Sequence, residues 1–222
     1  MEGARHARRA AAGRPARPLA AAADRGVHRL RGRARPLSEA ELSVAFVCTG
    51  NRFRSPIAEA LFVRDTNGLP VRTASLGTID LGPRPALPEA IVLAEGLGLD
   101  LSGHRARNLA DADLTDFDLV LGFERRHVLA AVVDAGAPIE RTFTLPDFVD
   151  LLATIPGQPL QSDRVERALV RIRHAHAQRP PGFRNAPMAE LRDPLGLPAA
   201  AQRETAQELD RLVAELSELL LA

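Results

Sequence analysis

The 222-residue chain has a single cysteine, Cys48, which is followed by Thr-Gly-Asn-Arg-Phe and then by Arg54 and Ser55. A loop that leads into a helix N-terminus points several backbone N–H groups at one spot, which becomes an anion site. The same donors stabilise a thiolate, so we expect Cys48 to be a nucleophile at neutral pH. The guanidinium of Arg54 suits two oxygens of a tetrahedral oxyanion, and the Ser55 hydroxyl can donate to the sulfur.

The flanking residues predict how this loop is built. Val44 to Val47 form a short apolar run of the kind found in a buried central strand. We expect Gly50 and Asn51 to supply the positive backbone angles of a sharp turn, and Ser55-Pro56 to cap and open a helix. The chemistry therefore lies between a strand and a helix.

This stretch, Cys-x5-Arg-Ser with Gly-Asn inside and Ser-Pro-Ile-Ala-Glu across its end, resembles the low-molecular-weight protein tyrosine phosphatase family and its arsenate-reductase relatives. The resemblance covers about residues 42–152 and 190–221. It implies a metal-independent phosphatase that needs no cofactor and forms a phosphocysteine on Cys48. Arg54 would bind the phosphoryl oxygens, and Asn51 would brace the loop. The loop residues expected to contact the substrate are Thr49, Gly50, Asn51, Arg52, Phe53 and Ser55.

A general acid is the other group that this chemistry requires. The leaving oxygen must be protonated when the thiolate takes the phosphoryl group, and a water must later be deprotonated. In the family an Asp-Pro in a late loop does both, and Asp193-Pro194 is the only Asp-Pro in the chain. We expect Asp193 to be the acid and base; the alternative is an Asp-Pro turn without a catalytic role. For His104 we expect a surface or loop-bracing role, with a role as base for the thiol as the alternative. For Arg107 we expect a role in organising the loop, with substrate binding as the alternative.

Two loop positions depart from the family. Arg52 stands where a small or aliphatic residue is usual, and Phe53 where a second cysteine is common. We expect Arg52 to favour anionic substrates and to disfavour the cationic guanidinium of phosphoarginine. After the Asp-Pro, Leu195 replaces the aromatic residue that often lines the slot for a phenol ring. Phe53 or Phe123 could supply that wall.

Apolar runs alternate with helical patterns along the rest of the chain, which predicts parallel β-α-β units. The expected fold is α/β, with a four-stranded parallel sheet and helices on both faces. Further strands are expected at 71–75, 117–123 and 142–145, and helices at 56–65, 88–97, 124–133, 146–152 and 199–220. Residues 153–190 form an irregular elaboration of the 42–222 phosphatase-like domain. Its one helix, at 164–177, carries a basic face that we expect to be solvated; docking of an acidic partner is the alternative.

Residues 1–37 are rich in arginine and contain only Glu2 and Asp24 as acidic residues. Their low hydrophobicity and high charge predict disorder. A targeting segment and a basic arm are alternatives to a tail without a specific role. The chain has no lysine and much alanine, as in a GC-rich bacterial genome. No apolar run approaches the length of a membrane span, and a lone reactive thiol favours a reducing compartment, so we expect a soluble, cytoplasmic protein.

The sequence thus predicts a phosphatase for phosphomonoesters, most simply protein phosphotyrosine. A single-cysteine arsenate reductase that uses an external thiol or redoxin is the alternative enzyme. A non-catalytic phosphate- or phosphoprotein-binding protein is the alternative of another class. The expected partner is a phosphorylated protein or a small phosphomonoester, with no membrane or nucleic-acid partner. The sequence leaves the oligomeric state open.

Overall fold

The computed structural model describes residues 41–156, 163–182 and 186–221. The basic segment 1–37 lies outside the described residues, so its expected disorder stays a prediction. Within the described part of the chain, no helix combines the length and apolar character that crossing a membrane requires.

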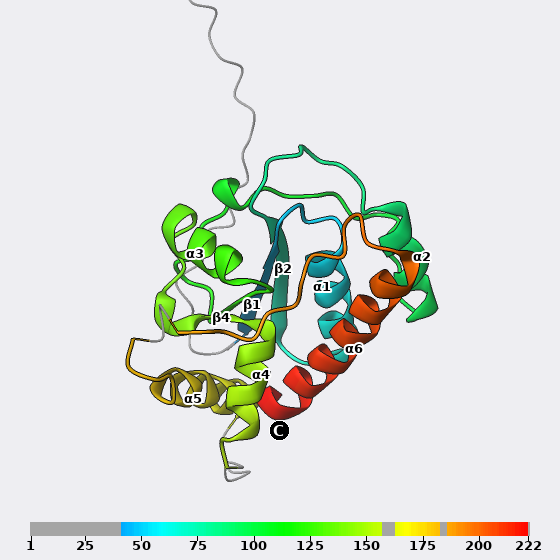
Figure 1. Ribbon diagram of the computed structural model, residues 1–222. Helices are drawn as coiled ribbons and strands as arrows, with labels where there is room; N and C mark the ends of the chain where they lie inside the picture. Colours follow the sequence, from blue (N-terminus) through cyan, green and yellow to red (C-terminus); the bar gives the residue numbers. More distant parts are fainter. Residues whose placement is uncertain (1–40, 157–162, 183–185, 222) are drawn as a thin grey trace, which may run out of the picture.

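Four parallel strands form one sheet in the order β2-β1-β3-β4 (Figure 1). Because β1 is paired on both edges and covered on both faces, all of its residues are buried and it reads as a nearly continuous apolar run. The expected α/β class and parallel sheet are confirmed. The strands are β1 (Leu42–Cys48), β2 (Val71–Gly77), β3 (Leu119–Gly122) and β4 (Thr142–Thr144).

Helices cover both faces of this sheet, which gives the three expected layers (Figure 1). They are α1 (Arg54–Asp65), α2 (Pro88–Gly96), α3 (Arg125–Asp134), α4 (Leu145–Ala153), α5 (Arg164–Ala177) and α6 (Ala199–Leu221), with two short 3₁₀ helices, η1 (Leu109–Asp111) and η2 (Ile139–Arg141). Side chains alternate across a strand. Val44 and Phe46 accordingly join the core shared with α1, α4 and α6, whereas Ala45 and Val47 join a smaller core with α3.

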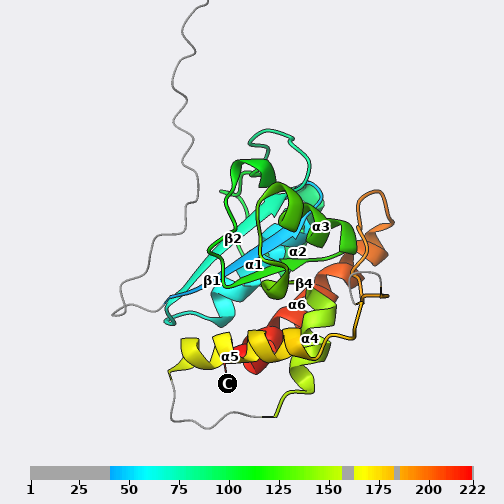
Figure 2. The same cartoon turned by 90° about the vertical axis from the view of Figure 1, so that its left-hand side faces the viewer.

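Helix α5 lies beside α4 and α6 (Figure 2), and here the expected solvated basic face is only partly present. Arg164, Arg173 and His174 are exposed as expected, but Arg167 and Arg171 are only 6% and 4% exposed. Arg171 Nε donates to the carbonyl of Leu219 in α6 at 2.6 Å. Since the long aliphatic stem of an arginine can cover apolar surface, a basic helical pattern does not by itself predict exposure.

The end of β2 touches the loop that follows β1. A Cβ added to Gly77 would lie 2.9 Å from the backbone carbon of Gly50 and 3.0 Å from the nitrogen of Asn51. No side chain fits between two backbones at that distance. Gly77 is therefore the residue that lets β2 support the loop.

We expect Gly77→Ala to destabilise the protein by about 1–3 kcal/mol, the usual cost of overpacking, and to reduce activity by displacing the loop. Urea unfolding and a phosphatase assay measure the two effects. Gly96→Ala is the matched control, because a Cβ there meets nothing within 4 Å at the end of α2. Its stability should be unchanged or raised by up to about 1 kcal/mol. Equal unfolding midpoints for both variants would contradict this role of Gly77.

Candidate active site

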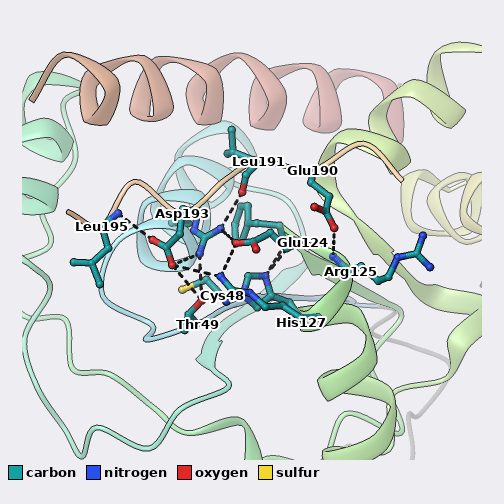
Figure 3. Close-up of polar contacts among 12 residues, drawn as sticks. Cys48, Thr49, Glu124, Arg125, His127, Glu190, Leu191, Asp193 and Leu195 are labelled. Atoms are coloured by element: carbon teal, nitrogen blue, oxygen red, sulfur yellow. Dashed lines mark hydrogen bonds and ion pairs between the residues drawn. The ribbon is translucent and has the colours of Figure 1, made fainter. Parts of the chain in front are cut away.

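Cys48 is the last residue of β1, at the carboxyl edge of the sheet where ligands of parallel α/β folds bind (Figure 3). Its sulfur is buried, accepts the backbone N–H of Asn51 at 3.2 Å and lies 3.0 Å from the Ser55 hydroxyl. The expected contact between Ser55 and the sulfur is thus present. However, Ser55 does not cap the helix: α1 begins at Arg54, and the cap position is Phe53. Instead of capping the helix, the serine hydroxyl contacts the sulfur and the Leu76 carbonyl.

Asn51 holds the loop in shape. It is the one non-glycine residue with a positive φ, 51°, among the residues that the structure describes. Its side chain accepts the backbone N–H of Arg107 at 2.8 Å and donates to Ser55 Oγ at 2.9 Å, and its carbonyl accepts from His104 Nε2 at 2.7 Å. The bracing roles expected for Asn51, His104 and Arg107 are confirmed. The positive φ expected at Gly50 is wrong, because asparagine alone makes the turn.

Arg54 is the most constrained charged side chain of the site, with only 1% of it exposed. Nη1 donates to Glu124 Oε1 at 2.5 Å and to the carbonyl of Leu191 at 2.9 Å. Nη2 donates to Asp193 Oδ2 at 2.5 Å and to Thr49 Oγ1 at 3.3 Å (Figure 3). A buried charge requires such partners. The structure therefore brings Asp193 to the loop of Cys48 although the two residues are far apart in the sequence.

Glu124 is a site residue that the sequence reasoning missed. It follows β3 and precedes α3, so it stands at the same carboxyl edge of the sheet as Cys48. Burial raises the pKa of its carboxyl group, but the hydrogen bonds from Arg54 and Arg126 outweigh burial and lower it. Glu124 is thus an ionised anchor for the guanidinium. Its place directly after a predicted strand is the signal that could have identified it.

His127, one turn further on, was missed as well. Its ring is fully buried, and Nδ1 accepts the backbone N–H groups of Phe123 at 3.3 Å and Glu124 at 3.1 Å. Nε2 lies 3.1 Å from Thr49 Oγ1. Burial, followed by the nearby charge of Arg54, lowers the pKa of His127 to about 4. The imidazole is therefore neutral at physiological pH, and because Nδ1 only accepts, its proton is on Nε2.

The aromatic residues that we expected to line a substrate slot, Phe53 and Phe123, are buried. Phe53 and Phe123 are 5% and 0% exposed, so neither side chain can line a substrate slot, and that suggestion is wrong. Phe53 can offer only its backbone to a ligand. The large apolar side chains that are exposed close to the site are instead aliphatic: Ile79, Leu81 and Leu195. The Ile79 N–H donates to the carbonyl of Thr49, and a Cβ on Gly50 would meet Leu81 at 3.2 Å, so two of the three adjoin the loop.

Comparisons with known proteins agree with this geometry. The family model described as low molecular weight phosphotyrosine protein phosphatase matches residues 43–166. The chain belongs to that family, which confirms the predicted class of metal-independent, cysteine-dependent phosphatase. The match includes Cys48 and Arg54 but ends before Asp193, so the role of Asp193 depends on its contacts.

Individual relatives point to two substrate classes. The low molecular weight protein-tyrosine-phosphatase Etp of Escherichia coli strain K12 is 38% identical over 103 residues, 46% of this chain and 67% of Etp. A protein-arginine-phosphatase of Bacillus subtilis is 32% identical over 110 residues, 49% of this chain and 73% of that protein. Among solved structures, the low molecular weight protein tyrosine phosphatase from T. tengcongensis is 28% identical, with a TM-score of 0.57 over 80% of this chain and 99% of that one.

The neutral His127 makes stability depend on pH. Between its pKa of about 4 in the folded protein and about 6.5 in an unfolded chain, only the unfolded chain binds the proton, so acidification favours unfolding. From pH 7 to pH 4 we expect the unfolding free energy of the native chain to fall by up to about 3 kcal/mol more than that of His127→Gln. Urea unfolding at several pH values measures the difference.

The exposed His174 of α5 provides the control, since His174→Gln should keep the full pH dependence of the native chain. If His127→Gln also kept it, the folded protein would not be holding this histidine neutral.

Proposed function

We propose that the protein hydrolyses phosphotyrosine in proteins through a phosphocysteine on Cys48, with Arg54 as phosphoryl ligand and Asp193 as acid and base. The observation that carries this proposal is the ion pair between Arg54 Nη2 and Asp193 Oδ2 at 2.5 Å. This pair holds a carboxyl group, 28% exposed, beside the anion loop that begins at the Cys48 thiol and leads into α1. A nucleophile, an anion ligand and a proton donor thus meet at one edge of the sheet.

The chemistry follows in two steps. In the first, Cys48 Sγ forms a bond to phosphorus, the bond from phosphorus to the ester oxygen breaks, and Asp193 gives its proton to that oxygen. In the second, the Asp193 carboxylate takes a proton from water, whose oxygen attacks phosphorus and releases the thiolate. Backbone N–H groups from Thr49 to Ser55 and the Arg54 guanidinium stabilise the charge on the equatorial oxygens in both steps.

Arg54 links substrate binding to the freeing of the acid. Nη2 is held by Asp193, while Nη1 is held by Glu124 and the Leu191 carbonyl. A phosphoryl dianion would compete with Asp193 for Nη2, and Glu124 would keep the guanidinium in the same plane. Substrate binding would then release Asp193 from its ion pair at the moment when its carboxyl group is needed.

The rim supports phosphotyrosine as the substrate class. Arg52 Nε donates to the Pro85 carbonyl at 2.8 Å, which holds its positive charge beside the loop. That charge repels the guanidinium of phosphoarginine but not a phenol ring. The aliphatic side chains of Ile79, Leu81 and Leu195 offer apolar contact to such a ring. A cytoplasmic location stays part of the proposal, because it follows from the single reactive thiol.

An arsenate reductase could use Cys48 and Arg54 in the same way. A carboxyl group at the mouth of the loop could then protonate the oxygen that leaves arsenic, so the contact between Asp193 and Arg54 separates the two enzymes only in part. Turnover that requires an added thiol or redoxin would identify the reductase, and turnover of a phosphomonoester without one would identify the phosphatase.

Hydrolysis of p-nitrophenyl phosphate in the presence of a chelator tests the assignment. We expect Cys48→Ser to abolish turnover, and Asp193→Asn to reduce it by about 10²-fold or more because the acid and base are lost. Asp116→Asn removes an exposed carboxylate elsewhere and should retain the native rate. Turnover that survives in Cys48→Ser would refute phosphocysteine chemistry.

Arg52→Gln tests the substrate class. The native protein should hydrolyse a phosphotyrosine peptide with a higher kcat/KM than a phosphoarginine peptide. Arg52→Gln should lower the ratio of these two kcat/KM values by roughly 5- to 10-fold, the effect of one charge pair near water. Arg203→Gln, on the exposed face of α6, should leave the ratio unchanged. A native protein that prefers phosphoarginine would contradict the assignment.

A further inference from the structure

The hydroxyl of Thr49 lies at the centre of the polar contacts around Asp193 (Figure 3). Thr49 Oγ1 is 3.1 Å from His127 Nε2, 3.3 Å from Arg54 Nη2 and 3.2 Å from Asp193 Oδ2. The reaction scheme above gives this hydroxyl no part, since only the backbone of Thr49 faces the phosphoryl group there. These three contacts nevertheless fix which way each proton points.

The directions follow by elimination. His127 Nδ1 accepts two backbone N–H groups, so its neutral ring has its single proton on Nε2 and donates it to Thr49 Oγ1. Arg54 Nη2 can only donate, so the second lone pair of Oγ1 faces the guanidinium. The threonine proton is then left with one acceptor, Asp193 Oδ2.

We propose that Thr49 is a positioning residue for Asp193, oriented by His127, and that its hydroxyl favours the carboxylate form of that residue. Both lone pairs of Thr49 Oγ1 are occupied, so this oxygen cannot accept a proton from a protonated Oδ2. Asp193 Oδ1 is held in turn by the Leu195 N–H at 3.1 Å. The carboxyl group is thus fixed at both oxygens. When a substrate takes the Nη2 hydrogen that faces Asp193, the other Nη2 hydrogen of Arg54 still faces Thr49 Oγ1, so the lone pairs of that oxygen stay occupied.

The charged groups around this hydrogen-bond chain are few. The groups facing His127 are Arg54 of α1, Glu124 and Arg126 at the start of α3, and Asp193. Asp193 itself faces Arg54 at 2.5 Å and Arg126 at 3.8 Å. A dianionic substrate would take Arg54 from Asp193, and Arg126 is half exposed, so Thr49 would be the closest remaining donor to Oδ2.

The consequence for the reaction concerns its pH dependence. Asp193 must be protonated to donate to the ester oxygen, so activity falls as the pH rises and the carboxyl group loses its proton. A donor on Oδ2 favours the carboxylate and moves this alkaline limb to lower pH. Removal of the donor lets the carboxyl group keep its proton to higher pH.

The experiment is the pH profile of kcat/KM for phenyl phosphate, whose poor leaving group requires the acid. In Thr49→Val we expect the alkaline limb to move to higher pH by about 0.5 to 1 unit, the effect of one hydrogen bond to a carboxylate. Thr49→Ser restores the hydroxyl and should return the limb to the native position. Thr49→Ala should also move the alkaline limb to higher pH. This second variant tests the inference even if the branched side chain of valine disturbs the loop.

Thr78→Val is the matched control, because the Thr78 hydroxyl contacts the carbonyl of Thr49 and not Asp193. It should leave the limb in place. The inference would be overturned if the alkaline limb of Thr49→Val and Thr49→Ala stayed at the pH of the native protein. It would also be overturned if the limb of Thr49→Ser moved as far as that of Thr49→Val. A merely structural role of Thr49 would change the rates without moving the alkaline limb.

The inference depends on the proposed role of Asp193, and Asp193→Asn separates the two. If the alkaline limb disappears in Asp193→Asn but keeps its native position in Thr49→Val and Thr49→Ala, only the role of Thr49 fails. If the limb persists in Asp193→Asn, the role of Asp193 as acid fails, and the role of Thr49 fails with it.

Discussion

The buried guanidinium of Arg54 is the constraint on which the rest of the site depends. A positive charge that is 1% exposed requires partners, and both terminal nitrogens of this guanidinium donate to acceptors. The chain supplies Glu124 from the end of β3, and the Leu191 carbonyl and Asp193 from the late loop. Arg54, in the first turn of α1, therefore constrains the positions of two segments that are distant in the sequence: the end of β3 and the late loop. The loop, β3 and the Asp-Pro segment meet because this charge requires all three.

A division of labour follows from this arrangement. Glu124 has a lowered pKa despite its burial and stays ionised, so it fixes the guanidinium permanently. Asp193 is the more exposed partner and is the one that an incoming dianion can replace. In the proposed reaction, the inner of the two carboxyl groups on this arginine is therefore structural, and the outer one transfers the proton. Burial and access to solvent, rather than residue type, separate the two roles.

Much of the fold and part of the site could be predicted from the sequence. What could be predicted differs from what could not for a physical reason. Cys48, Arg54 and Ser55 are near one another in the chain, so local geometry alone brings them together. The alternation of apolar runs with helical patterns predicted the parallel sheet correctly. The place of Glu124 after a predicted strand is visible in the sequence, but the contacts of Glu124 with Arg54 and of His127 with Thr49 depend on the pairing of β3 with β1, which the sequence does not show.

The errors in side-chain placement have a related cause. Residue type and helical spacing predict an exposed basic face for α5, but they do not show that α6 contacts Arg171. Residue type alone likewise does not show that Phe53 is buried. Asn51 makes the turn without help from Gly50, because its side chain can bond to the backbone across the loop. In each case the deciding contact joins segments that are distant in sequence.

The most direct test of the account is to trap the covalent intermediate. Asp193→Asn should slow hydrolysis of the phosphoenzyme, so mixing it with ³²P-labelled aryl phosphate and quenching in acid should yield labelled protein. Proteolysis and mass spectrometry should then locate one phosphoryl group on the sulfur of Cys48, with none on Cys48→Ser. A label on His127 or another side chain, or turnover by the native protein without any labelled intermediate in the trap, would contradict the central claim.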